Sequence, residues 1–139
     1  MEQQIFYAIG LMSGTSLDGL DICYTKFTRK ESIWNFEILK CATLPYSSEL
    51  ENSMRNAIHI SSEELLKLNS DYGFYLGEQV SEFISKHNIH DLDLIASHGH
   101  TIFHQPQKFF TLQIGDGTAI KSKTNKTRIY DFRDQDVIL

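Results

Sequence analysis

The chain has 139 residues, of which 41% are hydrophobic, 12% aromatic and 22% charged, and its formal net charge at pH 7 is −5. These values are typical of one globular domain with enough apolar side chains for a core. The acidic balance argues against nucleic acid as the main partner, although local amides and Mg²⁺ can still hold one nucleotide. No apolar run is long enough for a membrane span, and the N-terminus lacks the features of a secretory signal. We therefore expect a cytoplasmic protein without a membrane partner.

The first third of the chain predicts three consecutive antiparallel strands, over residues 5–11, 20–28 and 32–44. Small polar residues and two glycines between the first two strands predict a turn. Cys23 and Cys41 are isolated in strand-like stretches. They are expected to be small buried hydrophobes in a reducing compartment, with a disulfide or redox role as the alternative.

The middle of the chain predicts two helices, a short one ending near Ile58 and a long one ending near Lys86. Two residue pairs with capping-box spacing mark their starts: Ser48 with Glu51, and Ser61 with Glu64. Gly73 and Gly77 either weaken the long helix slightly or let another segment pack closely against it.

The last third predicts strands over residues 93–97, 109–114 and 127–131, with a helix before the last of them. The His98-Gly99-His100 segment is expected to be a loop at the end of the first of these strands. Asp116 is expected to cap the helix, which runs through Lys121. Two strand–helix–strand passages after an initial meander predict the α/β class with a mixed sheet.

The turn between the first two strands is a candidate anion site. Its backbone N–H groups and hydroxyls can form a nest for a phosphate without any lysine, and its glycines let a ligand approach closely. Asp18 and Asp21 could hold Mg²⁺, which would then bridge phosphate oxygens. A plain hairpin loop is the alternative. The sequence has neither the P-loop pattern nor the Rossmann glycine pattern.

Histidines at positions 98, 100 and 104 place polar groups at the end of a predicted strand, where ligands bind in open α/β sheets. Contact with a sugar or phosphate, metal ligation and ordinary loop hydrogen bonding are the alternatives. Asp116, in a Gly-Asp-Gly turn, is either a helix cap or part of an active site. Arg133, in the charged segment after the last strand, either binds a carboxylate or phosphate or belongs to a solvated charge run.

Taken together, four ordered blocks resemble the anhydro-N-acetylmuramic acid kinase family. The blocks are Ile9–Asp21, Ser97–Pro106, Thr111–Gly117, and Asp131-Phe132-Arg133 with Asp136. In the second block the family usually has glutamine where this chain has His100.

The resemblance implies an actin/Hsp70/hexokinase-like (ribonuclease H-like) fold, in which two α/β domains clamp ATP between them. Residues 1–139 would be the N-terminal ATPase-type domain. The implied reaction, part of peptidoglycan recycling in bacteria, opens the 1,6-anhydro ring of the amino sugar with water at C1. The sugar O6 takes the γ-phosphoryl group of ATP, which yields N-acetylmuramic acid 6-phosphate and ADP.

The resemblance also implies roles for individual residues. The ATP-binding positions are Gly14, Thr15, Ser16, Leu17, Asp18, Gly19, Leu20 and Asp21. Of these, Asp18 and Asp21 would lie near Mg²⁺. The residues that would face the sugar or order the site are His98, Thr101, His104, Asp116 and Arg133.

Family members are considerably longer, and this sequence contains neither the second phosphate loop nor the aspartate expected as general base. We therefore expect the isolated chain to be at best a weak ATP binder without turnover. The alternatives are a non-catalytic interaction module, a metal-dependent hydrolase built on the histidines, and a kinase of the same fold for another sugar. The oligomeric state stays open, with a homodimer as one option for a full-length member.

Overall fold

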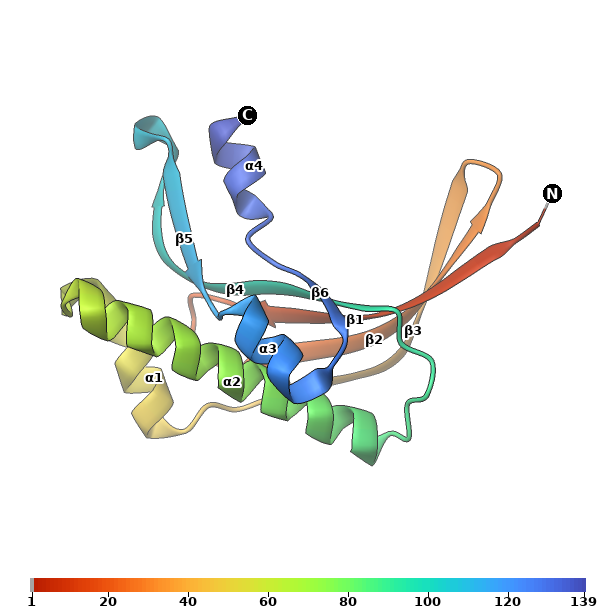
Figure 1. The fold of residues 1–139 in the computed structure, drawn as a ribbon, viewed down its shortest axis with the longest axis horizontal. Helices are drawn as coiled ribbons and strands as arrows, with labels where there is room; N and C mark the ends of the chain where they lie inside the picture. The colour runs from red at the N-terminus through yellow and green to blue at the C-terminus, as the bar shows by residue number, and fades with distance from the viewer. Residues whose placement is uncertain (1) are drawn as a thin grey trace.

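The computed structural model describes residues 2–139 as a six-stranded sheet with helices against it (Figure 1). In chain order the elements are β1 (Gln4–Ser13), β2 (Leu20–Lys30), β3 (Ile33–Leu44), α1 (Ser48–Arg55), the 3₁₀ turn η1 (Ala57–His59), α2 (Ser62–Lys86), β4 (Leu94–Gln105), η2 (Pro106–Lys108), β5 (Phe110–Ile114), α3 (Gly117–Thr124), β6 (Thr127–Ile129) and α4 (Arg133–Ile138). Among these residues no helix combines the length and the apolarity needed to cross a bilayer.

The sheet is mixed, which confirms the predicted α/β class. Its strand order is β3-β2-β1-β4-β5, and β6 pairs with the first part of β4. The predicted meander is confirmed, because β1 with β2 and β2 with β3 are antiparallel. β4 runs parallel to β1 and β6 and antiparallel to β5.

The capping box predicted for the long helix is confirmed. The Ser61 side chain accepts from the N–H of Glu64, and the Glu64 carboxylate accepts from the N–H of Ser61. The prediction for the short helix is wrong by one residue. Its N-cap is Ser47, whose hydroxyl accepts from the N–H of Leu50, and the α-helix ends at Arg55 before a 3₁₀ turn.

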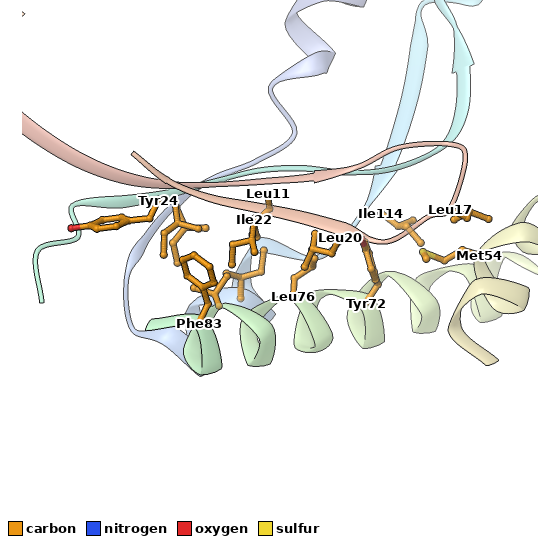
Figure 2. Close-up of a cluster of buried hydrophobic side chains, with 14 residues drawn as sticks. Leu11, Leu17, Leu20, Ile22, Tyr24, Met54, Tyr72, Leu76, Phe83 and Ile114 are labelled. Carbon is orange, nitrogen blue, oxygen red and sulfur yellow. The ribbon is translucent and has the colours of Figure 1, made fainter. Parts of the chain in front are cut away.

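The core lies between the sheet and α2, on what we call the covered face (Figure 2). Alternate residues of β1 and β2 reach it, among them Ile9, Leu20 and Ile22, which are fully buried. Gly73 lets α3 pack closely on α2, since a Cβ at this position would lie 2.6 Å from the Asp116 carbonyl oxygen. The predicted close packing at the α2 glycines is therefore confirmed.

On the opposite face of the sheet, which we call the open face, α4 is the one helix among residues 2–139 (Figure 1). Large apolar side chains here are exposed, among them Trp34, Phe36 and Ile38. The cysteines are not isolated, as the sequence suggested, because Cys23 and Cys41 are directly opposed in the β2–β3 register. The prediction that both are buried is wrong, because on this face Cys23 is half-buried and Cys41 is exposed; both thiols are free.

The prediction of a loop at His98-Gly99-His100 is wrong, because β4 continues through these residues. The register shows a bulge instead: Leu11 pairs with Ser97 and Ser13 pairs with His100, so β4 has one more residue than β1 over this stretch. Gly99, at φ +75°, provides the backbone conformation for the bulge. As a consequence His98 lies on the open face and His100 on the covered face.

Candidate functional site

The β1–β2 loop, residues 14–19, has a shape fixed by a short backbone bond and by one glycine. The N–H of Leu17 donates to the Gly14 carbonyl at 3.1 Å, and Leu17 itself adopts φ +60°. Gly19 has φ +153°, and a Cβ there would lie 2.4 Å from the Leu44 carbonyl oxygen. Only glycine fits at this position, so the end of β3 sets where the loop enters β2.

This loop offers polar groups to solvent. Thr15, Ser16 and Asp18 are exposed, and their N–H groups donate to no acceptor within residues 2–139. A Cβ at Gly14 would meet only the Ser16 hydroxyl, at 3.6 Å, so there is room above the backbone for a ligand atom. Free amides and hydroxyls of this kind suit an anion.

Two of the sequence-predicted ligand positions have buried side chains. Leu17 is 6% exposed and Leu20 is fully buried in the core. A ligand at the loop would therefore meet only the backbone at these two positions.

The carboxylate of Asp21, the second residue of β2, lies on the open face. The Thr43 hydroxyl donates to its Oδ1 at 2.6 Å and orients it. Asp21 lines a hollow of about 350 Å³ together with Met12, Cys23, His98 and other residues of the open face. Burial, together with the Cys41 thiol beside it, raises the pKa of Cys23, so the thiol of Cys23 favours its neutral form here.

Arg133 and His98 are brought together from distant parts of the sequence. The Arg133 guanidinium donates to His98 Nε2 at 3.4 Å, and His98 Nδ1 lies 2.9 Å from the Gly99 carbonyl, to which it donates. Phe132 packs edge-on against the His98 ring. Of the five predicted sugar-facing residues, His98 therefore shares the open-face hollow with Asp21, and Arg133 contacts His98.

The other three predicted residues lie apart from that pair. His104 is exposed on the β4–β5 arm, where its Nδ1 contacts the Thr111 hydroxyl at 3.1 Å. Thr101 accepts from the Gln113 amide at 3.2 Å. Asp116 caps α3 by accepting from the N–H of Ala119 at 2.9 Å, which confirms the predicted cap.

Asp116 also lines a small polar hollow of about 170 Å³ with Asn69, Gln113 and Asp131. Burial, with Asp134 and Asp116 nearby, raises the pKa of Asp131. Asn69 is a residue that the sequence did not single out. Its side chain accepts from the N–H of Gly115 at 2.8 Å and so fixes the Gly-Asp-Gly turn from α2.

The three histidines do not form a metal centre. His98 lies on the open face, His100 is buried on the covered face, and His104 is out on the β4–β5 arm. Within residues 2–139 no group of three or more His, Cys, Asp or Glu side chains is placed to hold a metal ion. The arrangement gives no support to the metal-dependent hydrolase considered above.

Behind the loop lies a buried polar network that the sequence did not reveal. The Tyr46 hydroxyl donates to Ser13 Oγ at 2.6 Å, Ser13 Oγ lies 3.1 Å from His100 Nδ1, and the Tyr46 and Tyr72 hydroxyls are 2.8 Å apart. Burial raises the pKa of Tyr72 and of Tyr46. Burial also lowers the pKa of His100, outweighing a contact with the Ser13 backbone that favours the charged form. All four groups are therefore neutral near pH 7.

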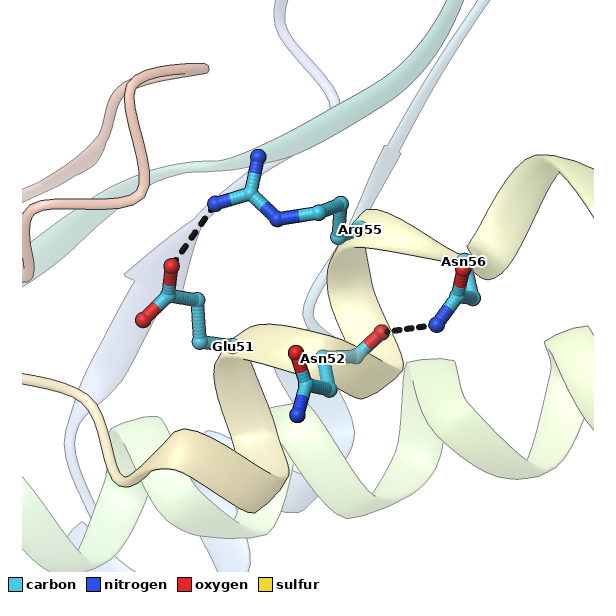
Figure 3. Close-up of polar contacts among 4 residues, drawn as sticks. All are labelled: Glu51, Asn52, Arg55 and Asn56. Atoms are coloured by element: carbon cyan, nitrogen blue, oxygen red, sulfur yellow. Dashed lines mark hydrogen bonds and ion pairs between the residues drawn. The ribbon is translucent and has the colours of Figure 1, made fainter.

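A cavity of about 180 Å³ adjoins this network and the loop. Its lining includes Thr15, Arg55, His100 and Thr101. Arg55 extends from the last turn of α1 and pairs with Glu51 at 2.7 Å (Figure 3). The cavity thus has one cationic side chain on the far side from the sheet.

Comparison of the sequence with models of known protein families assigns the chain to a family. The family model described as anhydro-N-acetylmuramic acid kinase matches residues 6–139. This chain belongs to the anhydro-N-acetylmuramic acid kinase family. The match confirms the resemblance drawn from the four sequence blocks.

Several proteins named anhydro-N-acetylmuramic acid kinase are similar to this member of the family. The one from Bacillus cereus (strain B4264) is 35% identical over 141 residues, which cover 94% of this chain and 36% of that protein. The one from Bacillus thuringiensis subsp. konkukian (strain 97-27) is 33% identical, with 94% of this chain and 37% of that protein covered. The chain therefore spans little more than a third of the length of these relatives.

Proposed function

We propose that residues 2–139 form the nucleotide-phosphate half of an ATP-dependent sugar kinase with an actin/Hsp70/hexokinase-like fold. The observation that carries the proposal is the β1–β2 loop, because its glycine-shaped backbone exposes free amides and hydroxyls beside two carboxylates. Membership of the kinase family supports the choice of ATP as the anion.

In this proposal the phosphates lie against Gly14–Ser16, where the backbone is accessible. The residues present fit Mg²⁺ as well, since the exposed carboxylates of Asp18 and Asp21 are the hard oxygen donors that this ion prefers. Mg²⁺ would neutralise charge on the phosphate oxygens. Two carboxylates do not complete a coordination sphere, so phosphate oxygens and water would supply the other ligands.

For the complete enzyme we propose the family reaction in the cytoplasm. Water adds at C1 of anhydro-N-acetylmuramic acid as the 1,6-anhydro bond breaks, and the sugar O6 receives the γ-phosphoryl group. His98 and Arg133 would face the sugar from the open face, where Arg133 provides a cation for a carboxylate or hydroxyl. Such chemistry depends on groups positioned from two sides, so we expect no turnover from this chain alone.

Titration calorimetry with Mg·ATP tests the nucleotide half of the proposal. The wild-type chain is expected to bind, and Asp18→Ala is expected to weaken binding at least tenfold in Mg²⁺, because a metal-linked carboxylate is lost. Glu31→Ala, in the distant β2–β3 turn, is the matched acidic control. Equal affinity of wild type and Asp18→Ala would contradict the placement, and clear phosphorylation of the anhydro sugar by this chain would contradict the expected lack of turnover.

A second candidate is a non-catalytic interaction module, and the open face favours it. Exposed Phe6, Trp34, Phe36 and Ile38 form an apolar surface that a polypeptide could cover. Adding the remaining two thirds of a Bacillus relative in trans tests this idea. Complex formation that is lost in a Trp34→Ser and Phe36→Ser double variant would support it, and no complex at micromolar concentration would contradict it.

A kinase of the same fold with another sugar as substrate is the third candidate. The substitution at His100 motivates it, since this residue lines the cavity next to the loop. A panel of anhydro and ordinary amino sugars, assayed on a family-length protein with histidine at this position, separates the two kinases.

A further inference from the structure

The hydrogen-bond chain behind the loop has a defined direction. The Tyr46 hydroxyl has one proton and donates it to Ser13 Oγ, so it accepts from Tyr72. Ser13 keeps its own proton, and we assign that proton to the 3.1 Å contact with His100 Nδ1. In this assignment His100 is neutral, with its proton on Nε2, in agreement with the pKa that burial lowers.

This series of hydrogen bonds ends next to the first residue of the β1–β2 loop. Ser13 is the last residue of β1 and is followed directly by Gly14, and its side chain is 2% exposed. Tyr46 follows β3, Tyr72 is on α2, and His100 is on β4. Tyr46 and His100 thus contact the Ser13 hydroxyl at which the loop begins, and Tyr72 contacts Tyr46.

The surroundings of His100 oppose its protonation. Arg55 on α1 lines the same cavity, His98 is on the same strand, and Tyr46 and Tyr72 are uncharged. Glu51 on α1 is paired with Arg55. No carboxylate lines the cavity within the described part of the chain, residues 2–139.

We propose that His100 is a positioning residue for the phosphate loop: its neutral ring accepts from Ser13 and fixes the start of the loop in its binding conformation. The inference rests on the proposed nucleotide site and extends it. If only a fraction of molecules has the loop in place, the apparent dissociation constant rises by the inverse of that fraction. Binding of Mg·ATP is therefore expected to depend on the charge of an imidazole that does not touch the ligand.

The test compares four proteins by Mg·ATP calorimetry at pH 7.5 and 5.5: wild type, His100→Gln, His100→Leu and Tyr46→Phe. Glutamine keeps an acceptor but does not titrate, leucine removes the acceptor, and Tyr46→Phe removes the donor to Ser13 while keeping the ring. At pH 7.5 we expect the leucine and phenylalanine variants to bind about tenfold more weakly, as for the loss of one buried hydrogen bond. His100→Gln should bind like wild type.

At pH 5.5 the wild type should lose more affinity for Mg·ATP than His100→Gln does. The two proteins have all other titratable groups in common, and ATP titrates in the same way in both experiments. Equal pH dependence of these two proteins, or wild-type affinity in His100→Leu, would overturn the inference.

A second measurement keeps the two proposals distinct. Amide hydrogen exchange at residues 14–19, without ATP, should be faster in His100→Leu and Tyr46→Phe than in wild type and His100→Gln. Absence of ATP binding in the wild type would contradict the proposed nucleotide site. Faster exchange at residues 14–19 in the two variants would still support the role of His100 in ordering the loop. Unchanged exchange in both variants would overturn it.

Discussion

The covered and open faces of the sheet differ most at the end where the β1–β2 loop lies. On the covered face, Ser13, His100 and Tyr72 are buried and bonded to one another or to Tyr46. On the open face, Asp21 is exposed and His98 and Arg133 are half-buried, with bonding capacity left over. Because side chains alternate along β1 and β2, and the bulge in β4 puts His98 and His100 on opposite faces, neighbouring residues serve different purposes. The covered-face residues hold the β1–β2 loop in place, and the open-face residues are free to contact a ligand.

The largest effect on the free energy of unfolding is expected from a mutation in the core of the covered face. Tyr72→Ala should lower the free energy of unfolding by about 3–5 kcal/mol, because a fully buried ring is replaced by a cavity. Tyr72→Phe, which removes only the hydroxyl, should cost about 1 kcal/mol. Urea denaturation followed by circular dichroism measures both. A loss below 1 kcal/mol for the alanine variant would mean that α2 does not hold this end of the sheet.

A smaller effect is expected from pH on the same face. Burial places the folded-state pKa of His100 below its ordinary value of 6.5, so the unfolded chain takes up this proton first as the pH falls. The stability contribution is complete above about pH 6.5 and declines below it, by at most about 1.4 kcal/mol per pH unit.

His100→Gln is the control for this pH effect. The unfolding free energy of wild type minus that of His100→Gln should fall between pH 7.5 and 5.5. A difference that stays constant would contradict the neutral state assigned to His100.

The smallest effect is expected on the open face. Arg133→Ala removes the contact with His98 but leaves no cavity, so the free energy of unfolding should change by no more than about 0.5 kcal/mol. The same urea measurement checks this. A loss of 2 kcal/mol would show that α4 is a structural part of the domain. It would also contradict the expectation that mutations on the open face affect stability much less than those on the covered face.

The elements that the sequence predicted well are those with local causes. The alternating and apolar runs of β1 to β3, the capping box at Ser61 and the cap at Asp116 all depend on neighbours within a few residues. The loop between β1 and β2 was also predictable, because glycines and hydroxyl residues mark it. The family match agrees with the four blocks that the sequence itself displayed.

The features that escaped sequence reasoning depend on register. The bulge at Gly99 is the extra residue in a pairing with β1, a strand more than 80 residues earlier in the sequence, so nothing local distinguishes it from a loop. The same bulge separates His98 from His100, which appear as one cluster in the sequence. The opposition of Cys23 and Cys41 and the contact of Tyr46 with Ser13 likewise follow from strand pairing.

The position of β3 has a practical consequence for any of these experiments. It lies at one edge of the sheet and is twelve residues long, and its side chains are mostly exposed. The backbone groups on its outer side are a template onto which another strand can add, and the apolar side chains next to them favour such growth. Glu37 and Lys40 are the charges within β3 that oppose it. Self-association should therefore increase with protein concentration and with salt, and it should begin at this edge.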